Sequence, residues 1–197
     1  MSTAAAPVRS GTVLADLLPA ARHRVAVDTA LVLGGAALTG LAAQIAVPIP
    51  GSPVPVTGQT FAALLIGSAL GARRGFLSLA LYAVVGMAGM PWFSGGTSGA
   101  GGATFGYVLG MLLAATVVGA LARRGGDRSV LRTAGTMAVG SALTYAVGVP
   151  YLALSTGMSA SAAIAAGLTP FLIGDAVKAL LAMGALPASW KLLGHRG

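Results

Sequence analysis

The fold of this chain is decided by residues 169–183, which read TPFLIGDAVKALLAM. Pro170 has a preset backbone φ and no amide hydrogen, so it suits the first turn of a helix, and helix formers follow from Asp175. Lys178 lies three residues after Asp175, and this spacing puts both side chains on one face of a helix. Their neighbours are apolar, so the acid and the base are costly unless they meet each other, a ligand or water. Two interpretations remain open: a functional site, or an ion pair that only fixes the helix against its neighbours.

Composition places this helix in a membrane. Of the 197 residues, 56% are hydrophobic and only 8% are charged, whereas soluble domains carry about 25% charged residues. The 30 glycines fit helices that approach one another closely at small residues. The absence of cysteine excludes disulfides, thiolate metal sites and cysteine nucleophiles. Of the four aspartates, only Asp175 lies deep within an apolar segment.

The net charge of +8 reflects membrane topology. Eleven of the twelve Lys and Arg residues lie in short hydrophilic breaks or near the chain ends, and Lys178 is the twelfth. An excess of Lys and Arg in short loops marks the cytoplasmic side of a membrane protein. Nucleic-acid binding would also require interleaved aromatic residues, which are missing, so we predict no nucleic-acid partner. A secondary attraction of these cations to anionic lipid in the bilayer is expected.

We predict an all-α integral membrane bundle of six transmembrane helices in the cell membrane, with both termini cytoplasmic. Residues 1–24 are assigned to a cytoplasmic N-terminal tail and residues 25–193 to a six-helix substrate-binding domain. The tail lacks a compact apolar core followed by a cleavage site, so it does not resemble a secretory signal. Prolines are expected to end several helices. The expected helices are residues 25–47, 57–70, 76–90, 104–122, 130–150 and 170–186.

Three loops alternate with the basic ones and carry no charge. Residues 48–60 contain four prolines within a stretch of eight residues. We expect this segment to be stiff and to form a lid or wall that covers another feature of the protein. Residues 91–103 contain five glycines, and their Trp92 and Phe93 belong either to the membrane interface or to a pocket. The third uncharged loop is expected at residues 151–167. Asp175 lies within about two turns of the start of the last helix, so we expect it near the outer face, beneath these loops.

Polar and aromatic side chains of the same outer layer are candidates to surround Asp175 and Lys178. Such a site suits a small, mostly apolar molecule with an amide-like head or a carboxylate. No metal or cofactor is predicted, and GxxxxGK[ST] is absent. The competing hypothesis is an intramembrane enzyme with Asp175 as general base. It is weak because His23 and His195 lie in the tails and no GxSxG or HExxH motif is present. The further candidate binding residues are Thr57, Gln59, Trp92, Phe93, Tyr107 and Tyr145.

Small residues recur at every fourth position in the first expected helix. Ala26, Ala30 and Gly34 form one such row, and a nearby stripe contains Ala36, Gly40 and Ala43. Small residues at this spacing let another helix approach closely. The row serves either packing inside this bundle or docking onto a separate subunit.

Four motifs occur together in an order that resembles the BioY family, the biotin-binding subunits (S components) of energy-coupling factor transporters. The motifs are Pro53-Val54-Pro55-x-Thr57-x-Gln59, Gly89-x-Pro91-x-Phe93-x-Gly95-Gly96, Gly106-Tyr107 and Pro170-Phe171-Leu172-x-Gly174-Asp175-x-x-Lys178-Ala179. The resemblance covers nearly the whole chain from the first to the last expected helix. Each motif is weak alone, and their combination is specific.

The resemblance implies a six-helix subunit that binds biotin from outside the cell. It implies as partners a transmembrane coupling subunit and two ATP-hydrolysing subunits. Ala26, Ala30 and Gly34 match the family's coupling surface on the first helix, with glycine where alanine is common. The chain has no nucleotide-binding motif of its own, so either the partners supply ATP energy or the protein acts alone by facilitated diffusion. A subunit for another vitamin remains an alternative.

Overall fold

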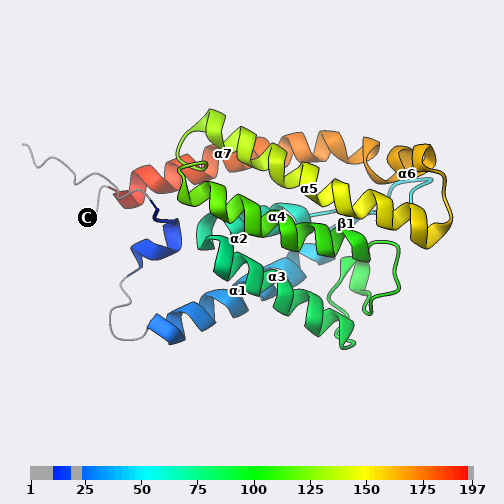
Figure 1. The fold of residues 1–197 in the computed structure, drawn as a ribbon, viewed down its shortest axis with the longest axis horizontal. Coiled ribbons are helices and arrows are strands. Elements are labelled where there is room, and N and C mark those ends of the chain that lie inside the picture. Colours follow the sequence, from blue (N-terminus) through cyan, green and yellow to red (C-terminus); the bar gives the residue numbers. More distant parts are fainter. Residues whose placement is uncertain (1–10, 19–23, 195–197) are drawn as a thin grey trace, which may run out of the picture.

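The computed structural model describes residues 11–18 and 24–194, and these form a bundle of helices (Figure 1). Four helical segments, covering residues 24–44, 105–123, 130–156 and 160–193, are long and apolar enough to cross a membrane. The predicted all-α membrane bundle is thereby confirmed. A short helix, α6 (Ala160–Gly167), precedes the last long helix. The bundle helices are α1 (Arg24–Gln44), α2 (Gln59–Leu70), α3 (Ala72–Met87), α4 (Phe105–Arg123), α5 (Val130–Thr156) and α7 (Leu172–Gly194).

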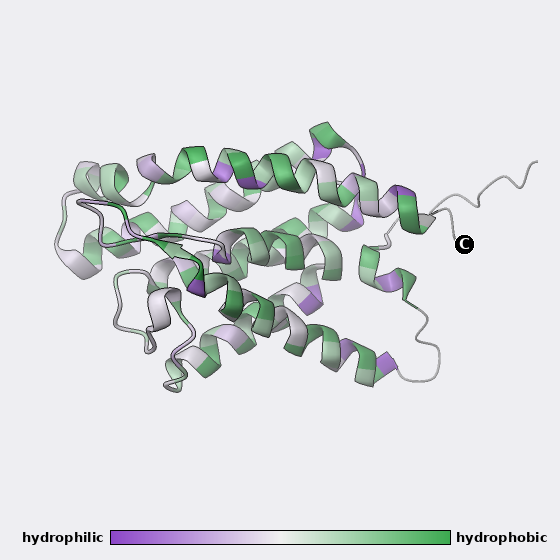
Figure 2. Ribbon diagram, turned by 180° about the vertical axis from the view of Figure 1, so that it is seen from behind, coloured by the Kyte–Doolittle hydropathy of each residue, from purple (hydrophilic) through white to green (hydrophobic). Residues whose placement is uncertain are grey.

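The bundle has two chemically different ends. At one end, α1 begins, α7 ends, and short turns join α2 to α3 and α4 to α5 (Figure 1). We call it the basic end, because Arg24, Arg73 and Arg124 lie there. The opposite end, called the loop end, holds α6 and the loops that follow α1 and α3. Hydrophobic colour dominates the helices between the two ends (Figure 2).

Two helices run through prolines that were predicted to end them. The expectation for Pro150 is wrong, because α5 continues to Thr156 and ends at Gly157, which has a left-handed φ of 72°. The expectation for Pro187 is also wrong, because α7 continues through it to Gly194. Prolines are tolerated inside membrane helices because neighbouring helices and local backbone adjustments satisfy the backbone groups that a proline leaves without a partner. The predicted third loop is therefore mostly helical, formed by the end of α5 and by α6.

The proline-rich segment forms a small hairpin at the loop end. Strand β1 (Ala46–Val47) pairs antiparallel with β2 (Val56–Thr57), and the prolines lie between them. α1 thus ends earlier than predicted, and Thr57, predicted to be helical, is in a strand. Helix α2 has only 12 residues, which corresponds to a length of about 18 Å. The hairpin therefore extends this side of the bundle beyond the start of α2. The Ser52 hydroxyl donates to the Ala166 carbonyl at 2.7 Å and ties the hairpin to α6.

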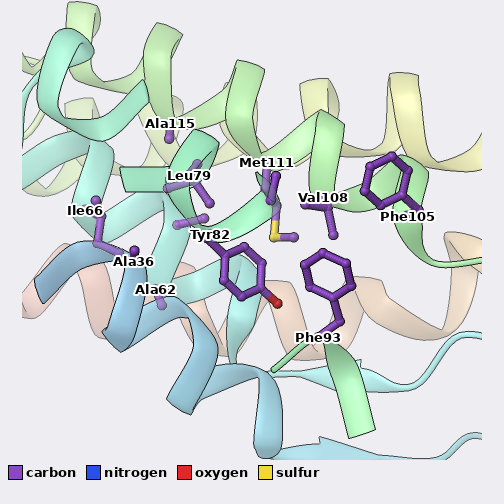
Figure 3. Close-up of a cluster of buried hydrophobic side chains, with 12 residues drawn as sticks. Ala36, Ala62, Ile66, Leu79, Tyr82, Phe93, Phe105, Val108, Met111 and Ala115 are labelled. Atoms are coloured by element: carbon purple, nitrogen blue, oxygen red, sulfur yellow. The ribbon is translucent and has the colours of Figure 1, made fainter. Parts of the chain in front are cut away.

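Helix α4 lies at the centre of the bundle, between α2, α3 and α5. A methyl group added at Gly110 would lie 2.5 Å from the Thr144 carbonyl oxygen of α5, so only glycine permits this approach. An aromatic and aliphatic cluster fills the space toward the loop end (Figure 3). In it, Phe93 reaches from the loop toward Val108 and Met111 of α4. The glycine-rich loop is thereby anchored to the core of the bundle.

At the basic end, the described part of the predicted tail packs onto the bundle. Residues 14–17 form a short 3-10 helix, Leu14–Leu17, and Val13 is fully buried. Arg74 donates to Asp16 and to Asp28 at 2.8 Å each, joining this segment to α1 and α3. Burial opposes ionisation of Asp16, but hydrogen bonds from Arg74 and from the Val13 amide hold its pKa below the usual value. Predicted tail residues 1–10 and 19–23, with His23, and also His195 lie outside the described residues.

A second contact at the basic end joins the α4–α5 turn to α7. Asp127 is fully buried and accepts a 2.7 Å hydrogen bond from the Trp190 indole. The Arg128 guanidinium lies over the same ring, 4.5 Å from its centroid. Burial raises the pKa of Asp127, although the hydrogen bond from Trp190 and the charge of Arg128 oppose this shift. This contact fixes the end of α7 opposite the Asp175–Lys178 pair.

Candidate substrate-binding site

A cavity of about 500 Å³, counted to its mouth, opens between the hairpin, the 91–104 loop and four helices. We call it the ion-pair cavity. Its lining residues are Val54, Pro55, Thr57, Gln59, Thr60, Phe93, Ser94, Thr104, Tyr107, Val108, Met111, Tyr145, Phe171, Asp175 and Lys178.

Asp175 and Lys178 meet on one face of the first two turns of α7. The Lys178 ammonium lies 3.3 Å from Asp175 Oδ1. Their side chains are only 14% and 18% exposed, respectively. Solvent screens a buried ion pair less than an exposed one, so the energy of this pair depends on the groups around it.

Two other helices hold this ion pair in place. Lys178 donates to the Thr60 hydroxyl of α2 at 2.7 Å. The Tyr145 hydroxyl of α5 donates to Asp175 Oδ2. One hydrogen of the ammonium and further lone pairs of the carboxylate remain for a ligand. The pair therefore offers one donor and one acceptor side by side.

Aromatic rings form much of the remaining wall. The Tyr145 ring lies edge-on to Tyr107, with centroids 6.4 Å apart, and 6.5 Å from the Phe171 ring. The Tyr107 hydroxyl donates to the Gly167 carbonyl at 2.7 Å, so this ring is fixed against the end of α6. Phe93 is 4% exposed and adds a further aromatic ring to the lining. These walls suit an apolar ring or chain beside the polar pair.

Seven of the eight predicted binding residues line the ion-pair cavity. Gln59 is tied there by a 2.9 Å hydrogen bond from its amide nitrogen to the Tyr82 hydroxyl. The structure places the eighth, Trp92, elsewhere: its indole donates to the Tyr82 carbonyl at 3.0 Å, and its ring packs on Gly40 of α1. The Trp92 carbonyl accepts from the Gln44 side chain at 3.2 Å. Trp92 thus joins the glycine-rich loop to α1 and α3.

Eight lining residues were not among the predicted binding residues: Val54, Pro55, Thr60, Ser94, Thr104, Val108, Met111 and Phe171. Thr60 follows the start of α2, and no sequence pattern shows that α2 would bring its hydroxyl against α7. Met111 is a single apolar residue within an apolar helix, so its sequence context carries no signal. Phe171 lies within the Pro170–Ala179 motif quoted above, and its place in that motif could have identified it as a binding residue.

The two rows of small residues on α1 face in different directions. Ala26, Ala30 and Gly34 are exposed, and a methyl group added at Gly34 would meet nothing within 4 Å. In contrast, Ala36 and Ala43 are buried in the bundle. The buried stripe accounts for packing within this chain, whereas the exposed row is open to another molecule.

Comparison with known proteins agrees with this architecture. The family model described as the BioY family matches residues 14–195. The Biotin transporter BioY2 of Lactococcus lactis is 36% identical over 154 residues, covering 77% of this chain and 83% of the relative. A probable biotin transporter BioY of Pyrococcus horikoshii is 35% identical over 159 residues, covering 79% and 91%.

A solved structure has the same fold. It is the crystal structure of the S-component for biotin from an ECF-type ABC transporter, with a TM-score of 0.77 and 20% sequence identity. The match covers 86% of this chain and 94% of that chain. Because the family model extends over nearly all the described residues, this chain belongs to the BioY family.

Proposed function

We propose that this chain captures biotin and takes part in its uptake across the cell membrane as the substrate-binding subunit of an energy-coupling factor transporter. The observation that carries the proposal is the ion-pair cavity, where one acid and one base lie beside aromatic walls in a BioY-family chain. The relatives reported above are named as biotin transporters. The intramembrane enzyme considered from the sequence has no support in those names.

The chemistry of the cavity fits biotin. The ureido head of biotin carries two N–H donors and a carbonyl, which match the carboxylate of Asp175 and the ammonium of Lys178. Its thioether ring is apolar and suits the walls formed by Phe93, Met111 and Tyr145. Asp175 accepts from a ureido nitrogen in this proposal. Lys178 either donates to the ureido carbonyl or neutralises the carboxylate of biotin.

The test is biotin binding by purified protein in detergent. We expect Asp175→Asn and Lys178→Ala each to weaken binding by about tenfold or more, because each removes a charged hydrogen-bond partner. The matched control is Ser189→Ala, which removes a hydroxyl bonded only within α7 at the basic end. Wild-type affinity in both site variants would remove these residues from the site.

A panel of vitamins tests the identity of the ligand. A ligand at about one hundred times its dissociation constant stabilises a protein by about 2.7 kcal/mol, so its binding raises the unfolding temperature. We expect biotin alone among the vitamins to do so. Stabilisation by a different vitamin would reassign the substrate within the same fold, and stabilisation by none would reopen the enzyme alternative.

The exposed row on α1 is the proposed docking surface for a transmembrane coupling subunit, which in turn joins two ATP-hydrolysing subunits. Close approach of a second helix needs small residues, and Ala26, Ala30 and Gly34 leave that face open. Ala30→Trp is expected to abolish coupled uptake in cells and to leave biotin binding intact. Ala146→Trp, at an exposed alanine of α5, is the matched control. Unchanged uptake in the Ala30 variant, or after deletion of the coupling subunits, would favour facilitated diffusion by the protein alone.

The proposed orientation places the basic end in the cytoplasm and the ion-pair cavity toward the outside. The support is the gathering of arginines at the basic end, together with uncharged segments at the loop end. The chain has no cysteine, so single cysteines report cleanly. Ser98→Cys, at the loop end, should react with a membrane-impermeant maleimide on intact cells. Arg124→Cys should react only after permeabilisation, and the reverse pattern would invert the orientation.

A further inference from the structure

Tyr82, in α3, is fully buried and is not part of the lining of the ion-pair cavity, yet it contacts residues of the cavity wall. Its ring lies 5.1 Å from the Trp92 ring and 5.2 Å from the Phe93 ring, measured between centroids. Figure 3 shows the Tyr82 and Phe93 rings beside each other in the core. A buried hydroxyl is costly unless it is hydrogen-bonded, so its partners indicate what this side chain does.

The hydrogen bonds of the Tyr82 hydroxyl have one consistent direction. The hydroxyl oxygen lies 3.1 Å from the Trp92 carbonyl oxygen, which can only accept, so the single hydroxyl hydrogen points there. The same hydroxyl lies 2.9 Å from the amide nitrogen of Gln59 and accepts a hydrogen bond from it. A half turn of this amide would exchange its nitrogen and oxygen and would place two acceptors against each other. Tyr82 therefore sets which end of the Gln59 amide faces it.

The other end of the Gln59 amide remains for the cavity. Gln59 is the first residue of α2, is 5% exposed and lines the ion-pair cavity. Within the described parts of the chain, no donor bonds to its carbonyl oxygen. An acceptor so little exposed to solvent is unfavourable without a partner, so a hydrogen-bond donor of a ligand would be favoured there.

We propose that Tyr82 is a positioning residue for the ligand site: its hydroxyl fixes the Gln59 amide so that the carbonyl oxygen, and not the nitrogen, is offered to the ligand. This inference rests on the proposed function, because biotin carries N–H groups that can donate to such an acceptor. Asp175 and Gln59 then act as acceptors and Lys178 as a donor, so the site favours a ligand that brings N–H groups. Tyr82 acts through Gln59 and does not touch the ligand.

A double-mutant cycle, measured by calorimetric titration of the purified full-length protein with biotin, tests this role. Tyr82→Phe keeps the ring and removes the hydroxyl. We expect it to weaken binding by about fivefold, because the ligand must then order the Gln59 side chain itself. Gln59→Leu is expected to weaken binding by about tenfold, because it removes the acceptor. The double variant should bind as Gln59→Leu does, and effects that multiply would overturn the inference, because they would show independent roles.

Tyr151→Phe is the matched control. The Tyr151 hydroxyl donates to the Ala100 carbonyl at 2.8 Å, so this variant also removes a tyrosine hydroxyl that is bonded to the loop after α3. It leaves the bond between Tyr82 and Gln59 in place, and we expect wild-type affinity for biotin. An equal loss of affinity in Tyr151→Phe and Tyr82→Phe would attribute both effects to anchoring of the loop and would overturn the positioning role.

Nuclear magnetic resonance of the wild-type protein gives a second measurement, which does not depend on the stability of Tyr82→Phe. The chain contains two glutamines, Gln44 and Gln59, so isotope-labelled glutamine yields two side-chain amide signals. The signal that is absent from Gln59→Leu, or kept in Gln44→Leu, belongs to Gln59. Saturation with biotin should shift this signal, because a new hydrogen bond to the carbonyl oxygen changes the electron distribution of the amide.

The outcomes separate this inference from the proposed function. An unchanged Gln59 signal in protein that binds biotin by calorimetry would overturn the inference and leave the proposed function in place. Failure of the wild-type protein to bind biotin at all would instead refute the proposed function, and this inference with it.

Discussion

Replacing Lys178 with methionine tests whether the ion pair is as buried as its geometry indicates. The substitution keeps most of the side-chain volume and leaves the Asp175 carboxylate in the cavity without its ammonium. The carboxylate keeps the hydrogen bond from Tyr145 as its remaining partner. Removing one member of a buried pair costs about 3–5 kcal/mol in proteins.

Two features reduce that cost here. The Asp175 side chain is 14% exposed at a cavity open to solvent, and the Tyr145 bond persists. We therefore expect the free energy of unfolding to fall by about 2 kcal/mol. In a chain of this size that change lowers the unfolding temperature by about 4–8 °C.

The assay is thermal unfolding of the purified protein in detergent at pH 7 without ligand. Arg124→Met, which removes an exposed cation at the basic end, is the control. Combining Lys178→Met with Asp175→Asn removes the uncompensated charge, so the double variant should recover most of the lost stability while remaining defective in biotin binding. The reasoning fails if the single variant unfolds at the wild-type temperature, or if the double variant is no more stable than the single one.

Two further predictions follow from close contacts away from the ion pair. A methyl group added at Gly86 would collide with the Phe93 ring, so Gly86→Ala should displace this cavity wall and weaken biotin binding by about tenfold in a titration. Gly34→Ala, whose added methyl meets nothing within 4 Å, should bind normally, and equal affinities of the two variants would contradict the prediction. Arg74→Gln should lower the unfolding temperature at neutral pH, because the pKa of Asp16 is held below 3.8 and its stabilising charge is present above that value. The difference in unfolding temperature between Arg74→Gln and wild type should become smaller as the pH falls through the lowered pKa of Asp16. A difference that stays constant down to that pH range would show that the Arg74–Asp16 ion pair does not cause the stabilisation.

Much of the architecture could be predicted because it depends on composition and on local spacing. Low charge and abundant small apolar residues require a bilayer whatever the details of packing. The three-residue spacing of Asp175 and Lys178 is a property of a single helix, and the two side chains do meet on one face of α7. The proline-rich segment was expected to be a stiff structure, and it is a hairpin over the cavity.

The prediction that prolines end helices was wrong at two positions, because contacts with neighbouring helices outweighed the local effect of proline. Pro150 and Pro187 both lie inside helices, because neighbouring helices in an apolar setting support the interrupted backbone. Trp92 was a candidate binding residue, but the course of the loop directs its indole to the Tyr82 carbonyl. Neither outcome can be read from neighbouring residues alone.

The sequence by itself relates residues within one helix to one another, because helical geometry sets which side chains share a face. The partners of those residues come from segments far away in the chain: Thr60 reaches Lys178 from α2, and Tyr145 reaches Asp175 from α5. Such contacts depend on how helices cross, and small residues such as Gly110 set how closely they approach. The chemistry of the ion pair is therefore local, whereas the cavity that makes it a binding site arises from packing between distant segments.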